Sequence, residues 1–216
     1  SRQGLAKPSE SFPKNCDSTF CRQDRSMKHL TRLISFFLML TGCYGSAYAQ
    51  VLLNPSFDDS GSTEEEPMAW VRWGEGFRRV TDWKPIHSGA GQLGYDHTAV
   101  SQGGNCGIWQ DVVGVQAGKK YKISLYVMAD KVEGARLPPN TLELRLEHAD
   151  NGQQSLLESK MIPMITLPTD GTWQEISIEG TTPSDSLRFL MVMTPLDGEN
   201  RGGKFKFDDV KVELVP

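Results

Sequence analysis

The chain has 216 residues, with 23 Lys and Arg against 27 Asp and Glu, giving a formal net charge of −4. This acidic balance, without any block of Lys or Arg, argues against nucleic acid as a partner. No run of ~20 apolar residues is present, so the sequence predicts no ordinary transmembrane helix. The length allows one large domain or two small ones.

The first 49 residues have the features of a processing region. Residues 1–26 are polar and lack periodicity, so we expect an unstructured leader or an over-long start. Residues 27–49 resemble a signal peptide, with a basic start, the apolar run Leu33–Leu40 and the cleavage motif Ala47-Tyr48-Ala49. This interpretation predicts a protein that is secreted or periplasmic.

A competing motif lies inside the same region. Leu40-Thr41-Gly42-Cys43 resembles a bacterial lipobox, in which the cysteine is lipidated and becomes the mature N-terminus. Cys43 would then anchor the protein to a membrane as an outer-surface lipoprotein. A membrane partner is expected only through this lipid anchor. The sequence leaves both alternatives open.

Residues 50–216 are expected to form one domain. Without the seven basic and three acidic residues of 1–49, this part carries 16 basic and 24 acidic residues, a net charge of −8. Cys106 is its single cysteine, so we expect a buried thiol and no internal disulfide, the alternative being an exposed thiol that oxidises or dimerises. We expect a monomer. The length suffices to bury one sizeable core.

Short strands separated by Gly- and Pro-containing turns are expected along this domain. The expected strands are 51–57, 77–81, 92–95, 107–113, 121–128, 142–147, 155–162, 173–178, 187–193 and 205–214. Apolar residues alternate with polar ones in most of them, and a step of three in the last strand predicts a bulge near Asp208-Asp209. This pattern predicts an all-β protein, a two-sheet antiparallel β-sandwich or jelly roll.

An ordered set of motifs in this domain resembles the CenC-type carbohydrate-binding modules. The motifs are Leu53-Asn54-Pro55-Ser56-Phe57-Asp58, Trp70, Ser88-Gly89 with Leu93, Gly107–Val112 followed by Ala117–Tyr121, Trp173, and Phe207-Asp208-Asp209-Val210. The resemblance implies a galactose-binding-like β-sandwich. It also implies binding of a polysaccharide or oligosaccharide on a concave sheet face or at loop tips, often beside a glycoside hydrolase.

The same resemblance implies a structural Ca²⁺ between the opening and closing strands. The matching positions are Asp58 and Asp208, and the neighbouring Asp59 and Asp209 could substitute. Because Ca²⁺ takes six to eight oxygen ligands, backbone carbonyls near Ser88-Gly89 would complete the shell. The alternative is that the acidic pair at 58–59 only solvates a strand end.

Exposed aromatic residues are the candidates for stacking on sugar rings. Trp70 and Trp173 match core positions of the family, whereas Trp73, Trp83 and Trp109 are free of such a role. We select Trp73 and Trp109 as candidate ligand contacts. The alternative is that Trp109 is a half-buried core residue.

Polar faces of the predicted strands supply the other candidate ligand contacts. If the strands share one sheet, their outward side chains converge on one ligand site. These side chains are Tyr126, Arg145 and Glu143, together with Trp109 or Gln110. An Arg fork suits sugar hydroxyls and acidic sugars. The alternative is that Arg145 pairs with its flanking glutamates.

Motifs of common hydrolases are missing. The sequence has no G-x-S-x-G elbow and no H-E-x-x-H. The favoured hypothesis is therefore a secreted, non-catalytic carbohydrate-binding module. The alternatives are a lipid-anchored structural or adhesive protein with the same fold and a small jelly-roll hydrolase or lyase.

Overall fold

The computed structural model describes residues 50–96, 105–131, 141–194 and 203–216, all in the compact unit Ala47–Pro216. The signal-peptide region, the leader and Cys43 lie outside the described residues. The strands are β1 (Val71–Trp73), β2 (Phe77–Val80), β3 (Gln92–Asp96), β4 (Cys106–Asp111), β5 (Lys120–Lys131), β6 (Thr141–Asp150), β7 (Gln153–Pro163), β8 (Gln174–Thr181), β9 (Arg188–Thr194) and β10 (Gly203–Val215). A 3-10 turn, η2 (Met164–Thr166), follows β7.

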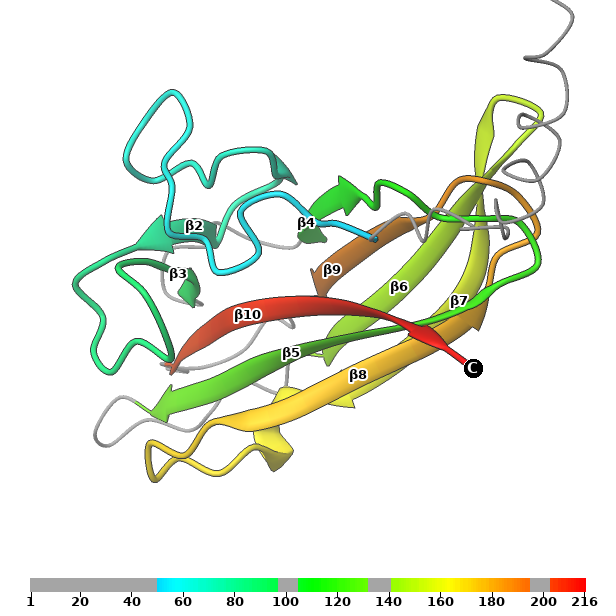
Figure 1. Cartoon of the computed structure of the whole chain (residues 1–216). Helices are drawn as coiled ribbons and strands as arrows, with labels where there is room; N and C mark the ends of the chain where they lie inside the picture. Colours follow the sequence, from blue (N-terminus) through cyan, green and yellow to red (C-terminus); the bar gives the residue numbers. More distant parts are fainter. Residues whose placement is uncertain (1–49, 97–104, 132–140, 195–202) are drawn as a thin grey trace, which may run out of the picture. The chain divides into compact units, whose positions relative to one another are not determined.

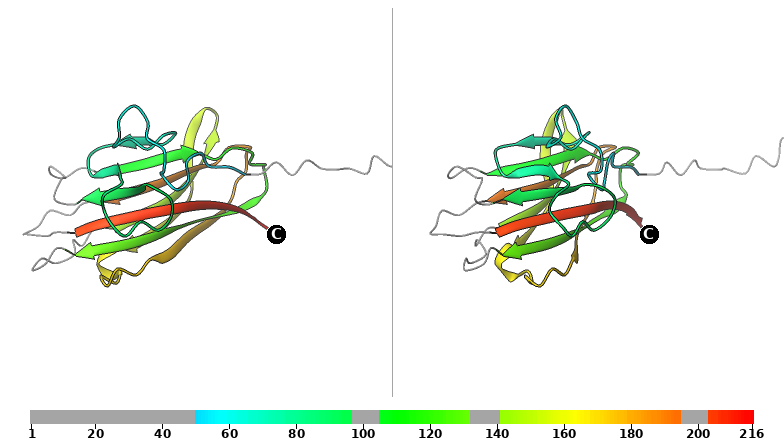
Figure 2. Two further views of the ribbon diagram at one scale, coloured as in Figure 1. Left: turned by 60° about the vertical axis from the view of Figure 1, so that its left-hand side comes forward. Right: turned by 90° about the vertical axis from the view of Figure 1, so that its left-hand side faces the viewer.

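Two five-stranded antiparallel sheets form a sandwich. Sheet A has the order β1-β4-β9-β6-β7, and sheet B has the order β2-β3-β10-β5-β8. Figure 1 shows β10, β5 and β8 side by side in one layer, with β9, β6 and β7 in the other; Figure 2 gives two further views. The predicted all-β sandwich is confirmed.

Alternating side chains of both sheets meet in one core. The inward residues of β5, Ile123, Leu125 and Val127, are at most 1% exposed, and the three leucines of β6 at 142, 144 and 146 are fully buried. Outward residues between them are polar, as period-two alternation requires. Trp70 is 7% exposed within this core, as predicted, whereas Trp173 is half-buried outside it.

The opening segment departs from the predicted strand at 51–57. It makes one isolated bridge, Val51 to Val113, and no strand. Asn54 and Phe57 have φ angles of 49° and 55°, in the left-handed region, so the chain cannot stay extended. Phe57 is fully buried, and the curled segment thereby packs onto the core.

The bulge predicted in the last strand is confirmed. Asp208 pairs with Tyr126 of β5, and the next pairing joins Lys211 to Ser124. Two residues, Asp209 and Val210, therefore oppose the single residue Leu125 on the partner strand, and Asp209 takes a φ of 50°. The bulge redirects the Asp209 side chain, which is half-buried.

A loop, residues 81–91, crosses the outer face of sheet B. The carbonyl of Trp83 accepts a hydrogen bond from Gln92, and Lys206, fully buried on β10, donates to the carbonyl of Lys84 at 2.6 Å. Trp83 covers Gly94 so closely that a Cβ there would lie 2.6 Å from the ring. The loop thereby delivers His87 and Ser88 to the bulge of β10.

In the described ranges, no helix is both long enough and apolar enough to cross a membrane.

Candidate functional site

The outer face of sheet A gathers four of the predicted ligand contacts. Trp109 on β4 pairs with Leu190 on β9, which pairs with Arg145 on β6. Directly paired residues point to the same side of a sheet, so Trp109 and Arg145 share a face at about 10 Å, two strand spacings. In the next row, Trp73 pairs with Gly107, and Glu143 lies two strands further on.

Trp73 lies on this face because residue 107 has no side chain. A Cβ at Gly107 would come within 2.1 Å of the six-membered part of the Trp73 ring. Trp73 remains 36% exposed, and it is a diagonal neighbour of Trp109, at about 7–8 Å between backbones. Two indoles therefore stand together on one sheet surface.

The Trp109 ring stacks against the guanidinium group of Arg188. The guanidinium carbon of Arg188 lies 3.6 Å from the centroid of the Trp109 ring. Arg188 also donates two hydrogen bonds to Asp111, at 2.7 and 3.1 Å, so its fork is fixed in position. Cation–π contact and ion pair together orient the indole.

Arg145 pairs with its flanking glutamates, the alternative weighed from the sequence. It donates two hydrogen bonds to Glu143, at 2.9 and 2.7 Å, and one to Glu147 at 3.5 Å. The Glu143 side chain is 10% exposed and also accepts from Ser159 at 2.7 Å. The hydrogen bonds from Arg145 lower the pKa of Glu143 against the opposing effect of burial.

Gln110 does not share this face. It follows Trp109 in β4 and therefore points to the opposite side, where it is 6% exposed. Its amide donates to the carbonyls of Leu53 and Ala69, and its oxygen accepts from the Leu53 N–H at 2.6 Å. Gln110 thereby attaches the opening segment to β4. Because its side chain points away from the outer face, its predicted convergence with the other ligand contacts is wrong.

Tyr126 also lies elsewhere. It belongs to β5 in sheet B, on the outer face, across the sandwich from Trp109 and Arg145. Its ring stacks on His87, with centroids 3.9 Å apart and an angle of 21° between the planes. The predicted convergence of Tyr126 with Arg145 and Glu143 is therefore wrong, because their strands belong to different sheets.

A group with metal-ligating atoms lies beside Tyr126. One nitrogen of His87 and one carboxylate oxygen each of Asp208 and Asp209 all lie within 4.8 Å of one another. Nδ1 of His87 is 2.5 Å from Oδ2 of Asp209. The hydroxyls of Ser56 and Ser88 donate to the other oxygen of Asp209, at 2.7 and 2.6 Å.

The two neighbouring carboxylates differ in their acidity. Burial, opposed by a hydrogen bond from the Ser88 N–H and reinforced by Asp209, raises the pKa of Asp208 to about 7. Burial also acts on Asp209, but hydrogen bonds from Ser88, Ser56 and His87 outweigh it and lower its pKa. A cation bound here would displace the proton that burial favours on Asp208.

Asp58, predicted as a metal ligand, does not belong to this group. Its carboxylate accepts from the backbone N–H groups of Ala90 and Gly91, and thereby caps the end of the 81–91 loop. Gly89 is required there, because a Cβ would lie 2.2 Å from the Asp58 carboxylate. Asp208 keeps its predicted place, and Asp209 and His87 join it.

The sequence favoured a loop or surface role for His87 over a role as metal ligand, and it assigned no ligand role to Ser56. They are more than 120 residues from Asp209 in the chain, so no local spacing links them to it. The available signal was their position inside the matched motifs, with His87 directly before Ser88-Gly89 and Ser56 before Phe57-Asp58.

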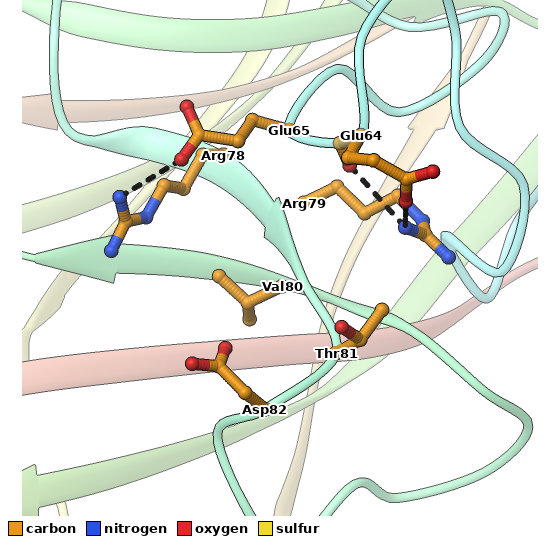
Figure 3. Close-up of a pocket in the computed structure, with 7 residues that line it drawn as sticks. All are labelled: Glu64, Glu65, Arg78, Arg79, Val80, Thr81 and Asp82. Carbon is orange, nitrogen blue, oxygen red and sulfur yellow. Dashed lines mark hydrogen bonds and ion pairs between the residues drawn. The ribbon is translucent and has the colours of Figure 1, made fainter.

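A cavity of about 260 Å³ lies between the charged loop at 64–65 and strand β2 (Figure 3). Arg79, 7% exposed, donates to the carbonyls of Phe57 and Asp58 and to Glu64. Arg78 pairs with Glu65 at 3.2 Å. These two arginines attach the loop at 64–65 to sheet B, so the residues that line this cavity have a structural role.

Comparison with known proteins supports the sandwich as a sugar-binding scaffold. A family described as "Carbohydrate binding domain" matches residues 49–195. A comparison with curated protein sequences gave no match.

Solved structures of three proteins share the fold at low identity. The module TmCBM61 in complex with β-1,4-galactotriose is 14% identical, covering 77% of this chain and 99% of that chain, with a TM-score of 0.52. The α-L-arabinofuranosidase MgGH51 is 20% identical over 79% of this chain and 27% of that chain, with a TM-score of 0.51.

The Stig cyclase Fisc from Fischerella sp. TAU is 14% identical over 78% of this chain and 99% of that chain, with a TM-score of 0.54. The fold thus serves proteins of more than one function, and the similarity to these structures concerns architecture alone. The family match extends over most of the chain and agrees with the motifs found in the sequence. The chain belongs to the CenC-type family of carbohydrate-binding domains.

Proposed function

We propose that this protein is a non-catalytic module that binds a neutral polysaccharide across the outer face of sheet A. The observation that carries this proposal is the pair of neighbouring indoles, Trp73 and Trp109, on the outer surface of one sheet. Flat aromatic rings offer apolar area to the C–H faces of sugars, and polar groups beside them fix orientation. Exposed Val71 and Met161 extend the apolar surface at both edges of the sheet.

The charges of this face favour a neutral polymer. Arg145 is bound by Glu143 and Glu147, and Arg188 is bound by Asp111. Since both guanidinium groups already have carboxylate partners, an acidic sugar would have to displace an ion pair. Sugar hydroxyls can instead hydrogen-bond to the outer atoms of these pairs without breaking them.

A depletion assay with insoluble polysaccharides tests the proposal. The full chain is incubated with xylan, β-glucan, galactan and an acidic polymer, pectate, and the unbound protein is measured. Galactan is included because a module of the same fold is solved with galactotriose. Retention on at least one neutral polymer and not on pectate is expected; retention on none of the neutral polymers contradicts the proposal.

We also propose that Asp208 and Asp209 hold a Ca²⁺ ion that fixes the loop 81–91 to the bulge. The fit rests on the donor set, in which two carboxylates and the hydroxyls of Ser56 and Ser88 offer oxygen atoms around one point. Ca²⁺ prefers such oxygen ligands, and His87 would then orient Asp209 through their contact. The ion would neutralise the buried pair.

Thermal unfolding with different cations tests the ion and its type. Ca²⁺ is expected to raise the melting temperature of chelator-treated protein, and an Asp208→Ala variant should lose that rise. Zn²⁺, which accepts imidazole readily, is the comparison. A rise with Zn²⁺ alone would contradict calcium, and no rise with either ion would remove the metal site.

The location of the protein is a separate proposal. We propose secretion after cleavage at Ala49, which leaves residues 50–216 as the mature domain. The family match that begins at residue 49 supports this boundary. Mass spectrometry of protein from its native host should find a free start at Gln50, whereas a lipid-modified Cys43 at the start would establish the anchored alternative.

A further inference from the structure

A second cavity lies on the outer face of sheet B, across the sandwich from the two indoles. It has a volume of about 400 Å³, and Asp209 and Val210 of the β10 bulge form part of its lining. Its polar lining comes from the opening segment and three strands: Ser56, Ser124, Tyr126, Glu175, Asp209 and Lys211. The hydrogen bond from the Val210 N–H to the carbonyl of Pro55, at 3.0 Å, fixes the opening segment beside the bulge.

Several of these polar groups have no hydrogen-bond partner among the described residues. Ser124 is 4% exposed, yet its hydroxyl lines the cavity without such a partner. The hydroxyl of Tyr126 and the carboxylate of Glu175 are likewise unpartnered in this part of the chain. The Ser124 Oγ atom is accessible from the cavity rather than fully enclosed, so a ligand there can hydrogen-bond to it directly.

The wall beside these groups is aromatic and rigid. The Tyr126 ring stacks on His87, and Trp173 meets His87 edge-on with centroids 5.2 Å apart. Asp209 holds the imidazole from its other side, through the contact at Nδ1. The Tyr126 ring is thus supported in one orientation before any ligand arrives.

The charges of the lining include both signs. Glu175 is an acceptor and Lys211 is a donor that also pairs with Glu213 at 2.7 Å, while the Asp209 oxygens are already engaged by Ser56, Ser88 and His87. Ser124 and Tyr126 can donate and accept. A mixture of donors and acceptors around an aromatic wall suits a neutral ring with several hydroxyls better than an anion or a cation.

We propose that this cavity binds a single neutral sugar unit, as a second carbohydrate site independent of the sheet A face. The proposal takes its ligand class from the proposed function, but it uses other residues on the other sheet. A sheet face suits the interior of a polymer, whereas a partly open cavity of about 400 Å³ suits one sugar unit. The two sites together would let one module hold a chain and a separate sugar end.

An NMR titration with monosaccharides tests the second site. Full-length protein, at constant Ca²⁺, is titrated with galactose, glucose, mannose, xylose and arabinose. The variant Ser124→Ala/Glu175→Ala removes two of the unpartnered groups. The control is Glu179→Ala, a matched change on the same strand and face but outside the cavity lining, where Glu179 pairs with Lys120 at 2.7 Å.

At least one monosaccharide is expected to shift the Trp173 indole signal in the wild type and in the control. The double variant, with unchanged thermal unfolding, should bind that sugar at least ~10-fold more weakly while retention on polysaccharide stays as in the wild type. If no sugar shifts Trp173, or the double variant binds as the wild type does, the second site is refuted.

Failure of the second site and failure of the proposed function are distinguishable. Polysaccharide retention without any effect at Trp173 refutes the second site and leaves the sheet A face intact. A Trp173 response without polysaccharide retention refutes the sheet A face and supports the second site.

Discussion

At the scale of single residues, Trp73 is the side chain on which the proposed binding face depends most. It is the more open of the two indoles, since the ring of Trp109 is contacted by Arg188. Truncating a central aromatic contact typically costs 2 kcal/mol or more, which is roughly a 30-fold loss of affinity. We therefore expect Trp73→Ala to weaken polysaccharide binding by at least ~10-fold in affinity electrophoresis.

The control for this variant is Trp83→Phe, which changes an indole of the 81–91 loop on the other side of the sandwich. It should retain full affinity. Equal losses in both variants would indicate general destabilisation and would count against Trp73 as a contact.

Asp208 should govern the pH dependence of stability. Its pKa is raised from 3.8 in the unfolded chain to about 7 in the fold, so its neutral form is favoured in the folded state. The contribution of Asp208 to the free energy of unfolding is then fully present below about pH 4 and is lost as the pH rises through about 7. The loss is up to about 4 kcal/mol, at 1.36 kcal/mol per pKa unit. Asp209 and Glu143, whose pKa values are lowered, act oppositely and only in the acid range.

With chelator present, the melting temperature of the wild type should therefore fall between pH 5 and pH 8. Asp208→Asn should remove most of this fall, because the amide cannot ionise. A variant that falls as steeply as the wild type would contradict the assignment of this pH dependence to Asp208.

Sequence alternation located Trp109, Glu143 and Arg145 on outward positions, because period two depends on neighbouring residues alone. It could not associate His87 with Asp209, since their contact is created by the 81–91 loop folding back over sheet B. Alternation also could not decide whether Arg145 contacts a ligand or forms an ion pair. In the structure, the guanidinium group of Arg145 is paired with Glu143 and Glu147.

At the scale of elements, Gln110 joins the opening segment to β4. Its side chain makes three hydrogen bonds to the backbone of Leu53 and Ala69. Gln110→Ala removes them and leaves backbone groups unsatisfied, which typically costs 1–3 kcal/mol for such a group. We expect destabilisation of about 2–4 kcal/mol in denaturant unfolding, and no loss of polysaccharide affinity under conditions where the variant is folded.

A loss of affinity in folded Gln110→Ala protein, with little destabilisation, would restore Gln110 as a ligand contact. Gln110→Glu is a useful companion because it keeps the shape of the side chain but removes both donated hydrogen bonds. It should be destabilised similarly.

The bulge of β10 was predictable because the step from Phe207 to Val210 breaks the alternation within the sequence itself. The curl of the opening segment was not, since its apolar residues fit a strand and only the left-handed angles of Asn54 and Phe57 exclude it. Those angles are stabilised by burial of Phe57 in the distant core.

At the scale of the whole molecule, the division of strands between sheets decides which residues can act together. The sequence predicted the strands and the sandwich, but β5 and β6 are consecutive and nevertheless belong to different sheets. Tyr126 and Arg145 therefore face away from each other on opposite layers. This division produces two separate polar surfaces, one on each outer face of the sandwich.

The five tryptophans allow one spectrum to read both surfaces. Trp73 and Trp109 lie on sheet A, Trp173 lies beside the cavity on sheet B, and Trp70 and Trp83 are buried. The most direct measurement is an NMR titration of the indole N–H signals with a soluble oligosaccharide of a retained polymer. We predict shifts of the Trp73 and Trp109 signals with Trp70 and Trp83 unchanged; binding that leaves both Trp73 and Trp109 unchanged would contradict the proposed sheet A face.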